Sequence, residues 1–451
     1  MNRLWTCLTI AAVGFAMPHV SGIDAAESET RDLAATRLEA LKPSKLLLKP
    51  PKGLSGGFTV ARTAPGVDFA VYPGQFAGAR LWSSWGDVLA ASDGRFYAAI
   101  GDHDAPHGTT FVYCVDPKEK TVTRVIDCNQ IVTAPPDKYS PGKIHAPLVE
   151  AGDGGIYAFG YRGSVRKTGS ETGYRGDWLL RYRPDTGRAE SLGAPVPFSS
   201  VPVLKHCPAL GCLYGLSVPG LTMPQPRTQF FRYDLEAGRV TFACDVDANG
   251  PRAIIVSRDG RVYFGGGDPS SGGPVLMRYE PRKHQVTKLA ARIPGDGMLR
   301  AASRADANGI AYGISKDGVV FAFDTNTETV TEIANVFVGG KLYTAVCRLD
   351  PTDTYLYYIP GAHGRSGETG TPVIQLNVKT RRCKVLAFLN ETLRQQRNYN
   401  LGGTYGIALS SDGSQLFASF NGAQLPAGKQ SEFGLCSALL LHIPGSERDS
   451  R

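Results

Sequence analysis

Histidine and tyrosine side chains that could move a proton stand near arginines at several places in the chain. His145 lies in the segment SPGKIHAPLVE, and Tyr214 lies in LYGLSVPG. Tyr161 and Arg162 open a basic segment, and Arg227 follows further along. Histidine and tyrosine are common general acids and bases, and arginine neutralises carboxylates and sulfates in a planar geometry. A fold that gathers these residues would bind an acidic substrate and could transfer protons on it.

Each of these residues also has a structural interpretation. A lone histidine such as His145 often only holds the fold through a hydrogen bond, and Tyr214 could pack between structural units. His363 and Arg365, in PGAHGRSGETGTP, extend the set of candidates for binding an acidic substrate. The sequence contains no GxSxG, P-loop or HExxH motif. A glycosidase with paired carboxylates stays open, because spatial neighbours cannot be recognised from one sequence.

Two groups of residues are candidates for a divalent metal site, with Ca²⁺ or Zn²⁺ as the ion. His103 and His107 are four residues apart in GDHDAPHGTT, and His206, Cys207 and Cys212 lie together in LKHCPALGC. Histidine and cysteine are zinc ligands, but the first pair lies in a predicted loop and the cysteines form no CxxC pair. A local disulfide between Cys207 and Cys212 explains the second group equally well.

The elements that must position these residues come from an internal repeat. One copy is VLAASDGRFYAAIGDHDAPHGTTFVYCVDPKEKTVTRVI, and another is AIIVSRDGRVYFGGGDPSSGGPVLMRYEPRKHQVTKL. Each copy predicts four short strands, with tight turns between the first and second and between the third and fourth. We count seven copies, which begin near Val88, Pro147, Val201, Ala253, Ala301, Thr344 and Gly406. Four antiparallel strands repeated every ~40–60 residues predict an all-β, seven-bladed β-propeller rather than a pair of β-sandwiches.

Loop length distinguishes the two faces of this propeller. The connections between second and third strands are long and variable, as in GYRGSVRKTGSETGYRGD, whereas the other turns within each repeat are short. All second-to-third connections of a propeller leave on one face. Variable loops on a rigid scaffold are where function usually lies, although neutral drift in length is the alternative. We therefore expect the candidate residues to gather on that face, near the central channel.

The N-terminal part of the chain differs from the repeats. Residues 1–22 predict a secretory signal peptide, with Arg3 ahead of an apolar run too short to span a bilayer; an uncleaved anchor is the alternative. Residues 23–55 predict a helical arm or linker, because ESETRDLAATRLEALK is helix-like. The propeller is expected over residues 56–446 and a tail over 447–451. The segment FTVARTAPGVDFAVY, from Phe58, could supply a strand to the last blade.

Charge and cysteine content restrict the class of partner. The formal net charge is +8, but no run of Lys and Arg alternates with aromatic residues, so we expect an acidic ligand and no nucleic acid. No other apolar segment is long enough to insert stably into a membrane. We expect an exported monomer, secreted or periplasmic. Eight of the nine cysteines follow the leader, and disulfides and buried thiols are both open.

Several segments resemble a family of secreted bacterial propellers. They are YSPGKIHAPLVEAGDGGIYAFGYRGS, YRGDWLLRYRPDTGR, APVPFSSVP and GGTYGIALSSDGSQLFASFNG. The chain is similar, more remotely, to propeller polysaccharide lyases such as the ulvan lyases. That resemblance implies β-elimination on polymers that contain uronate: a base removes the proton beside the carboxylate, an arginine-type group neutralises the carboxylate, and a tyrosine or histidine protonates the leaving oxygen.

The lyase resemblance assigns roles to particular residues. It implies that His145 is the histidine of the GKIH motif, that Tyr214 is the counterpart of a lyase tyrosine and that Arg227 is the neutralising group. The lyases look as if they carry a second histidine where this chain has Tyr161, which weakens the implied catalysis. The leading hypothesis is recognition, and also cleavage, of an acidic polysaccharide or oligosaccharide. The alternatives are a non-catalytic binding propeller of the cell envelope and a small-molecule hydrolase with a channel metal.

Overall fold

The computed structural model describes most of the chain after residue 33. The described residues are 34–75, 82–102, 108–132, 134, 138–161, 172–220, 227–248, 250–267, 274–333, 338–340, 342–425 and 433–448. The predicted signal peptide and the candidate residues His103, His107 and Arg162 lie outside them.

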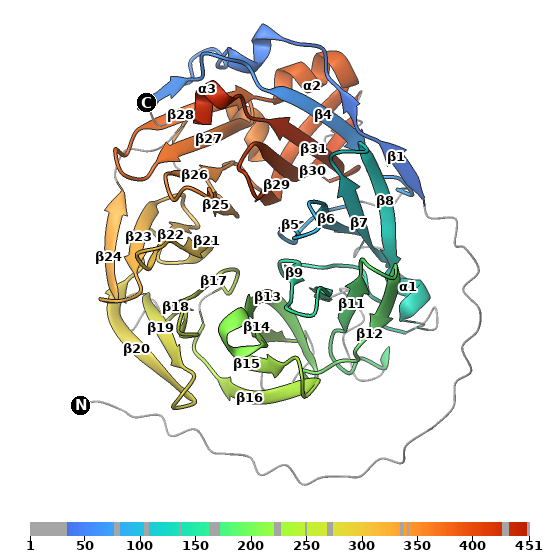
Figure 1. Ribbon diagram of the computed structural model, residues 1–451, viewed down its shortest axis with the longest axis vertical. Helices are drawn as coiled ribbons and strands as arrows, with labels where there is room; N and C mark the ends of the chain where they lie inside the picture. Colours follow the sequence, from blue (N-terminus) through green and yellow to red (C-terminus); the bar gives the residue numbers. More distant parts are fainter. Residues whose placement is uncertain are drawn as a thin grey trace.

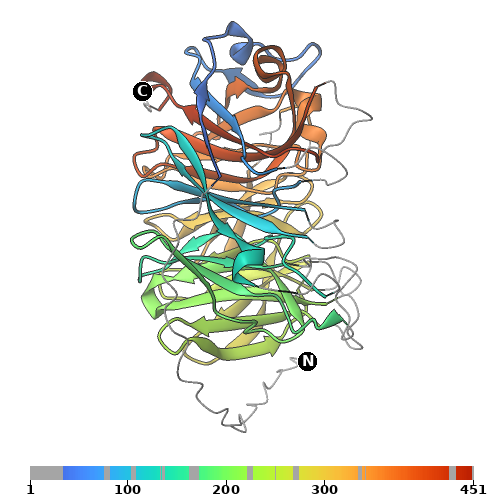
Figure 2. The same cartoon turned by 90° about the vertical axis from the view of Figure 1, so that its right-hand side faces the viewer.

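Seven β-sheets surround a central channel, as the repeat predicted (Figure 1). The first three blades contain β5 (Leu89–Ala90), β6 (Phe96–Gly101), β7 (Thr110–Asp116) and β8 (Thr121–Asp127); β9 (Val149–Glu150), β10 (Ile156–Phe159), β11 (Leu179–Arg183) and β12 (Arg188–Ser191); and β13 (Ser199–Cys207), β14 (Cys212–Pro219), β15 (Gln229–Asp234) and β16 (Arg239–Asp245). The next three contain β17 (Ile254–Val256), β18 (Val262–Gly266), β19 (Val275–Glu280) and β20 (Gln285–Arg292); β21 (Leu299–Ala305), β22 (Ile310–Ser315), β23 (Val320–Asp324) and β24 (Thr329–Ile333); and β25 (Cys347–Leu349), β26 (Tyr355–Tyr358), β27 (Pro372–Asn377) and β28 (Cys383–Phe388). Seen edge-on, the ring is a disc whose strands cross its thickness (Figure 2).

The seventh blade closes the ring by combining both ends of the chain. It contains β29 (Tyr399–Leu409), β30 (Gln415–Gln424) and β31 (Ser437–His442) from the C-terminal end. Its fourth strand is β4 (Gly66–Val71), which pairs antiparallel with β31 from Gly66 opposite His442 to Val71 opposite Ser437. This confirms the prediction that the segment from Phe58 supplies a strand to the last blade.

The predicted N-terminal helical arm is wrong over the described residues. Residues 35–37 and 39–40 form the short strands β1 (Ala35–Arg37) and β2 (Glu39–Ala40), which pair with β8 and β4. Further on, β3 (Phe58–Val60) runs parallel to β28. The outermost strand of each blade leaves backbone donors and acceptors unpaired, and pairing with them outweighs the weak helix propensity of the arm.

Helices are short and lie between or beside the strands. They are α1 (Cys128–Ile131), α2 (Asn390–Arg397) and α3 (Gly445–Arg448), with 3₁₀ turns η1 (Lys45–Leu48), η3 (Pro208–Leu210) and η5 (Arg365–Thr369). Within the described ranges, none of them has the length and apolar character that crossing a membrane requires.

The apolar core lies between neighbouring blades, because strand side chains alternate between two buried faces. In β14, Leu213 packs towards the second blade, whereas Tyr214 and Leu216 pack towards the fourth. The latter two contact Phe230 of β15 and Tyr279 of the next blade in one apolar cluster. Burial on both faces is what makes each blade depend on its two neighbours.

Gly215 of β14 shows how tightly these layers pack. A Cβ atom at this position would overlap the ring of Phe231 and approach the carbonyl oxygen of Val203 at 2.9 Å. We expect Gly215→Ala to lower the free energy of unfolding by about 1–3 kcal/mol, because overpacking forces neighbours to move. Gly152→Ala is the matched control, since a Cβ there would have no heavy atom within 4 Å. Equal denaturation midpoints for the two variants would contradict this interpretation.

Candidate functional site

The starts of the innermost strands meet at one end of the channel. Side chains from these starts, from the connections between second and third strands and from the interior of β29 form a group that we call the channel-mouth cluster. Its members are Trp85, Lys143, His145, Tyr161, Arg252, Arg300, Tyr343, His363, Tyr405 and Phe433. They come from all blades except the third, so the cluster exists only in the closed ring.

Local hydrogen bonds set the position of the aromatic residues in this cluster. Trp85 follows Ser84, whose backbone N–H donates to the Asn421 side chain at 2.7 Å while its carbonyl accepts from that amide at 2.9 Å. The Trp85 indole N–H donates to Ser83 Oγ at 2.6 Å. The Tyr161 backbone N–H donates to the Lys143 carbonyl at 2.9 Å. This bond brings Tyr161 beside the segment that leads into β9, the innermost strand of the second blade.

His145 is held as a neutral imidazole. Its Nδ1 lies 3.3 Å from the Pro202 carbonyl oxygen, and Nη1 of Arg252 lies 2.6 Å from its Nε2 and 3.3 Å from its Nδ1. Because the Pro202 carbonyl can only accept, it favours the tautomer with the proton on Nδ1. Burial, followed by the charges of Arg252 and Lys143, lowers the pKa of His145 well below its usual value. To act as a base, His145 would first have to release Arg252.

Tyr161 and Lys143 complete this side of the mouth. The Tyr161 ring lies 4.6 Å from the His145 ring, centroid to centroid. The Lys143 ammonium lies 3.8 Å from the centre of the Trp85 ring and 5.3 Å from that of Tyr161. Contacts of this kind hold a cation at the mouth through the negative faces of the rings.

Two arginines project from the fourth and fifth blades towards the same place. Arg252 donates from Nη2 to the Trp85 carbonyl at 2.8 Å, and its guanidinium carbon lies 4.4 Å from the Tyr405 ring centre. Arg300 donates to the Gly250 carbonyl at 3.0 Å and to the Tyr343 hydroxyl at 2.8 Å. Among the described residues, no carboxylate pairs with either arginine. Burial lowers the pKa of Arg252.

The remaining rings form an apolar floor beside these cations. Trp85 lies 5.0 Å from Phe433, 5.0 Å from Tyr405 and 5.4 Å from His363, and His363 stacks on Tyr343 at 5.6 Å. Burial, followed by the charges of nearby cations with Arg252 first, lowers the pKa of His363. Both histidines are therefore neutral near pH 7, and the positive charge of the mouth comes from lysine and arginine.

The structure brings three of the predicted site residues together and separates the others. His145, Tyr161 and His363 belong to the channel-mouth cluster. Tyr214 is fully buried in the core between the third and fourth blades. Arg227 is exposed and paired with Asp245 at 3.1 Å, and Arg365 is exposed and paired with Glu368 at 3.1 Å.

The three candidate metal ligands of the LKHCPALGC segment do not face one common point. Cys207 and Cys212 face each other across the β13–β14 hairpin, whereas His206 alternates to the other face of the sheet. A hydrogen bond from Cys212 lowers the pKa of Cys207 to about 7. In the described ranges, no three His, Cys, Asp or Glu side chains are placed to hold a metal ion, and all eight cysteines are thiols.

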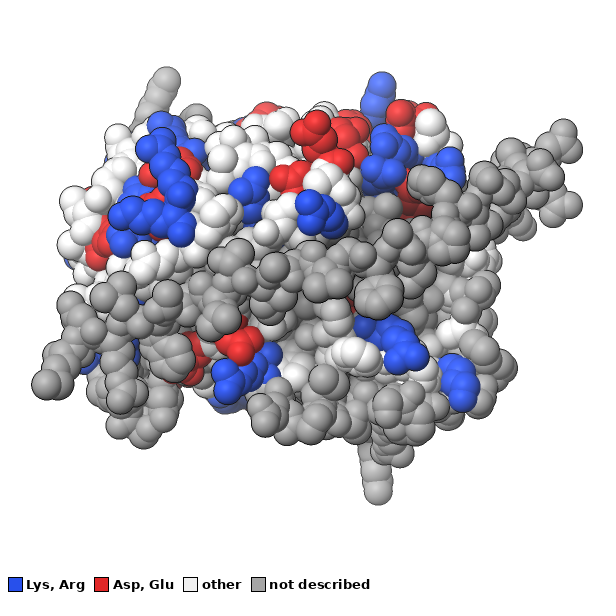
Figure 3. All heavy atoms as spheres, turned by 90° about the horizontal axis from the view of Figure 1, so that it is seen from below, with Lys and Arg blue, Asp and Glu red and all other residues white. Residues whose placement is uncertain are grey.

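Most of the cationic and aromatic members of the cluster were not among the residues predicted from the sequence. Trp85, Arg252 and Tyr343 each stand just before an inner strand, and Arg300 is the second residue of one. An alignment of the seven repeats by their first strands would have placed them at one end of the channel. On the outside of the ring, the face seen from below carries both basic and acidic side chains on its described part (Figure 3).

Comparison with known proteins identifies the architecture. The WD40 repeats of RRP9 superpose with a TM-score of 0.52 at 10% identity, covering 86% of this chain and 100% of that one. U3-55K gives 0.51 at 10% identity, with 82% and 98% covered, and a chain of the mitotic checkpoint complex gives 0.50 at 11% identity, with 90% and 99% covered. The chain is a seven-bladed β-propeller with WD40-like structural neighbours. No protein-family model and no curated protein matches its sequence.

Proposed function

We propose that the protein binds an acidic saccharide at the channel-mouth cluster, outside the cytoplasm. The observation that carries this proposal is the pair Arg252 and Arg300, two guanidinium groups framed by aromatic rings and, within the described residues, matched by no carboxylate. Charges in such a setting favour an anionic partner, because a guanidinium binds a carboxylate through two parallel hydrogen bonds.

The aromatic floor supports a sugar as the carrier of that negative charge. The C–H faces of a pyranose ring pack on aromatic side chains, and Trp85, His363 and Phe433 provide adjacent rings. Lys143, above Trp85, supplies a third positive charge. A uronate residue combines an apolar ring face with one carboxylate and matches both parts of the site. The predicted signal peptide supports an extracellular or periplasmic ligand.

Lys143→Met tests the proposal. We expect this variant to bind a uronate oligosaccharide about tenfold more weakly than the native protein, since it removes one cation from the mouth and keeps most of the side-chain volume. Isothermal titration calorimetry measures the change. Lys283→Met, which removes an exposed lysine from the β19–β20 turn, is the matched control. Equal affinities in both variants, or equal binding of a neutral oligosaccharide by native protein, would contradict the proposal.

Eliminative cleavage of the bound saccharide is a second candidate, favoured by the contact between Tyr161 and His145. Neutral His145 could accept a proton after ligand binding draws Arg252 away, and the Tyr161 hydroxyl could protonate the leaving oxygen. We expect ultraviolet absorbance from an unsaturated uronate product, and its loss in His145→Ala and Tyr161→Phe. A folded protein that binds uronate without producing this absorbance would leave the non-catalytic binding function in place.

A further inference from the structure

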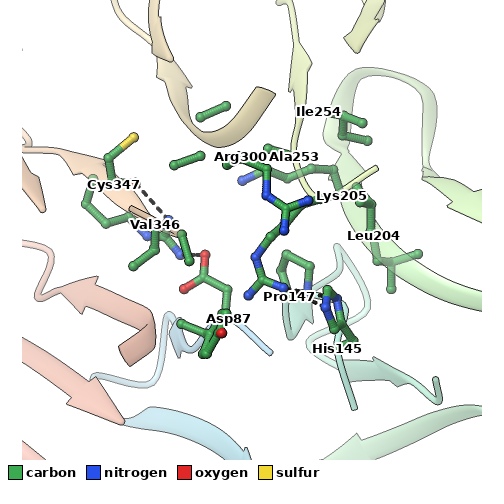
Figure 4. A pocket seen from close by; sticks show the side chains of 17 residues that line it. Asp87, His145, Pro147, Leu204, Lys205, Ala253, Ile254, Arg300, Val346 and Cys347 are labelled. Atoms are coloured by element: carbon green, nitrogen blue, oxygen red, sulfur yellow. Dashed lines mark hydrogen bonds and ion pairs between the residues drawn. The ribbon is translucent and has the colours of Figure 1, made fainter. Parts of the chain in front are cut away.

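A small cavity in the channel, beneath the cluster, collects positive charge from four blades. Its volume is about 30 Å³, and its charged lining residues are Lys205 of β13, Arg252, Arg300, Arg348 of β25 and Asp87. Figure 4 shows the side chains of Lys205, Arg300 and Asp87 converging on the channel. Four cations against one carboxylate leave an excess of three positive charges around one small cavity.

The single carboxylate is already occupied. Asp87 forms an ion pair with Arg348, which also donates to the Cys347 carbonyl at 2.9 Å. Arg252 and Arg300 have only neutral acceptors, namely His145 with backbone and tyrosine oxygens. The side-chain ammonium of Lys205 forms no hydrogen bond or ion pair within the described part of the chain, although the charge of Asp87 attracts it and that of Arg348 repels it.

Two arginines of the cavity lining also have hydrogen-bond donors without an acceptor in the described part of the chain. The Nε–H groups of Arg252 and Arg300 are buried, and no acceptor lies within reach of either among the described residues. A buried donor without an acceptor costs free energy, and a buried charge without a counter-charge costs more. Burial and the nearby charge of Arg348 lower the pKa of Lys205 to about 8. An anion in the cavity would balance part of this charge and would place an acceptor beside the two arginines that line it.

We propose that the cavity beneath the channel-mouth cluster binds a small inorganic anion of about the size of chloride, held by Lys205 and the arginines around it. The size follows from the volume, which accommodates about one or two water-sized groups and no sugar ring. Two sources could supply a negative group of this size: a free halide, or a carboxylate projecting from a ligand at the mouth. We assign the site to the free ion, because Lys205 lies on β13 beneath the mouth rather than in it.

Bromide is the probe, because it resembles chloride and scatters X-rays anomalously. Native crystals grown without saccharide and soaked in bromide should show an anomalous peak in the cavity beside Lys205 Nζ. In solution, bromide or chloride should raise the melting temperature of the native protein above its value in a bulky sulfonate salt of equal ionic strength. A carboxylate-only site would show neither effect without a uronate ligand, and that result would overturn the proposal.

Lys205→Met separates specific binding from general screening by salt. This variant keeps the apolar stem and removes the charge, so we expect it to bind bromide at least about tenfold more weakly and to lose the halide-dependent rise in melting temperature. Lys288→Met, at an exposed position of β20, should keep both. An equal halide effect in the two variants would overturn the proposal. Uronate binding by Lys205→Met would remain, which distinguishes this site from the mouth.

Discussion

Asp87→Asn will lower the free energy of unfolding by about 3–5 kcal/mol, because it removes the only carboxylate among the residues that line the cavity. Arg348 reaches from the sixth blade to Asp87 and to the Val88 carbonyl, 3.3 Å away, in the first blade. Asparagine keeps the shape and can still accept from the Val88 N–H, which lies 2.9 Å from Asp87 Oδ1. The loss therefore measures charge, and urea denaturation measures the loss.

Two further variants show whether the effect belongs to the channel. Asp245→Asn breaks the exposed pair with Arg227, whose side chains are 45% and 63% exposed, and should cost no more than about 1 kcal/mol. Lys205→Met added to Asp87→Asn should restore part of the lost stability, since it lowers the number of unbalanced cations. If Asp87→Asn and Asp245→Asn lowered the free energy of unfolding equally little, the charge of Asp87 would not stabilise the cations of the channel.

The architecture could be predicted because patterns that are local in the sequence determine it. Alternating strands, short turns and a sevenfold repeat determine the blades, and FTVARTAPGVDFAVY was the segment expected to supply a strand to the last blade. The arm at residues 35–40 could not be predicted in the same way. Its strands β1 and β2 exist because distant blades offer unpaired backbone edges, and a helix-like composition says nothing about those edges.

The site was predictable only where sequence neighbours are also spatial neighbours. His145 and Tyr161 flank β9 and β10 of one repeat, and their contact follows from the hairpin between them. Arg252 and Arg300, by contrast, contribute through the ring: Arg252 reaches His145 from two blades away. Tyr214 was predicted to belong to the site but does not. It lies in the interior of β14, where its side chain points into the apolar core between blades.

Charge in the channel also bears on how the mouth would work. Arg252 lines the cavity, contacts His145 and packs against Tyr405, so it connects the mouth with the space beneath it. A carboxylate at the mouth would attract this guanidinium away from His145 and free the imidazole Nε2 for proton transfer. An anion beneath it would compete for the same guanidinium. The two proposed sites are thus expected to influence each other through Arg252.

Glu447→Gln will lower the free energy of unfolding by about 2–3 kcal/mol. This buried carboxylate of α3 accepts the backbone N–H groups of Arg62 and Thr63 at 2.7 and 2.9 Å, and pairs with Lys384 at 2.8 Å. It therefore joins the N-terminal segment, the sixth blade and the end of the chain where the ring closes. Glutamine keeps one acceptor oxygen but places an amide against the Lys384 ammonium, and thermal or chemical denaturation will record the cost.

The same residue makes ring closure sensitive to acid. Burial alone would raise the pKa of Glu447, but the bonds from Lys384, Thr63 and Arg62 outweigh it and lower the pKa below its usual value. A carboxylate with a lowered pKa stabilises the fold above its unfolded-state pKa, and that stability is lost as the pH falls through the folded-state value. The stability difference between the native protein and Glu447→Gln should therefore narrow below about pH 4.

Glu391→Gln, at an exposed position of α2, is the control, and its stability should differ little from that of the native protein at any pH. A gap between native protein and Glu447→Gln that stayed constant from pH 7 to pH 3 would mean that shape and packing, rather than the charge of Glu447, hold the two ends of the chain together.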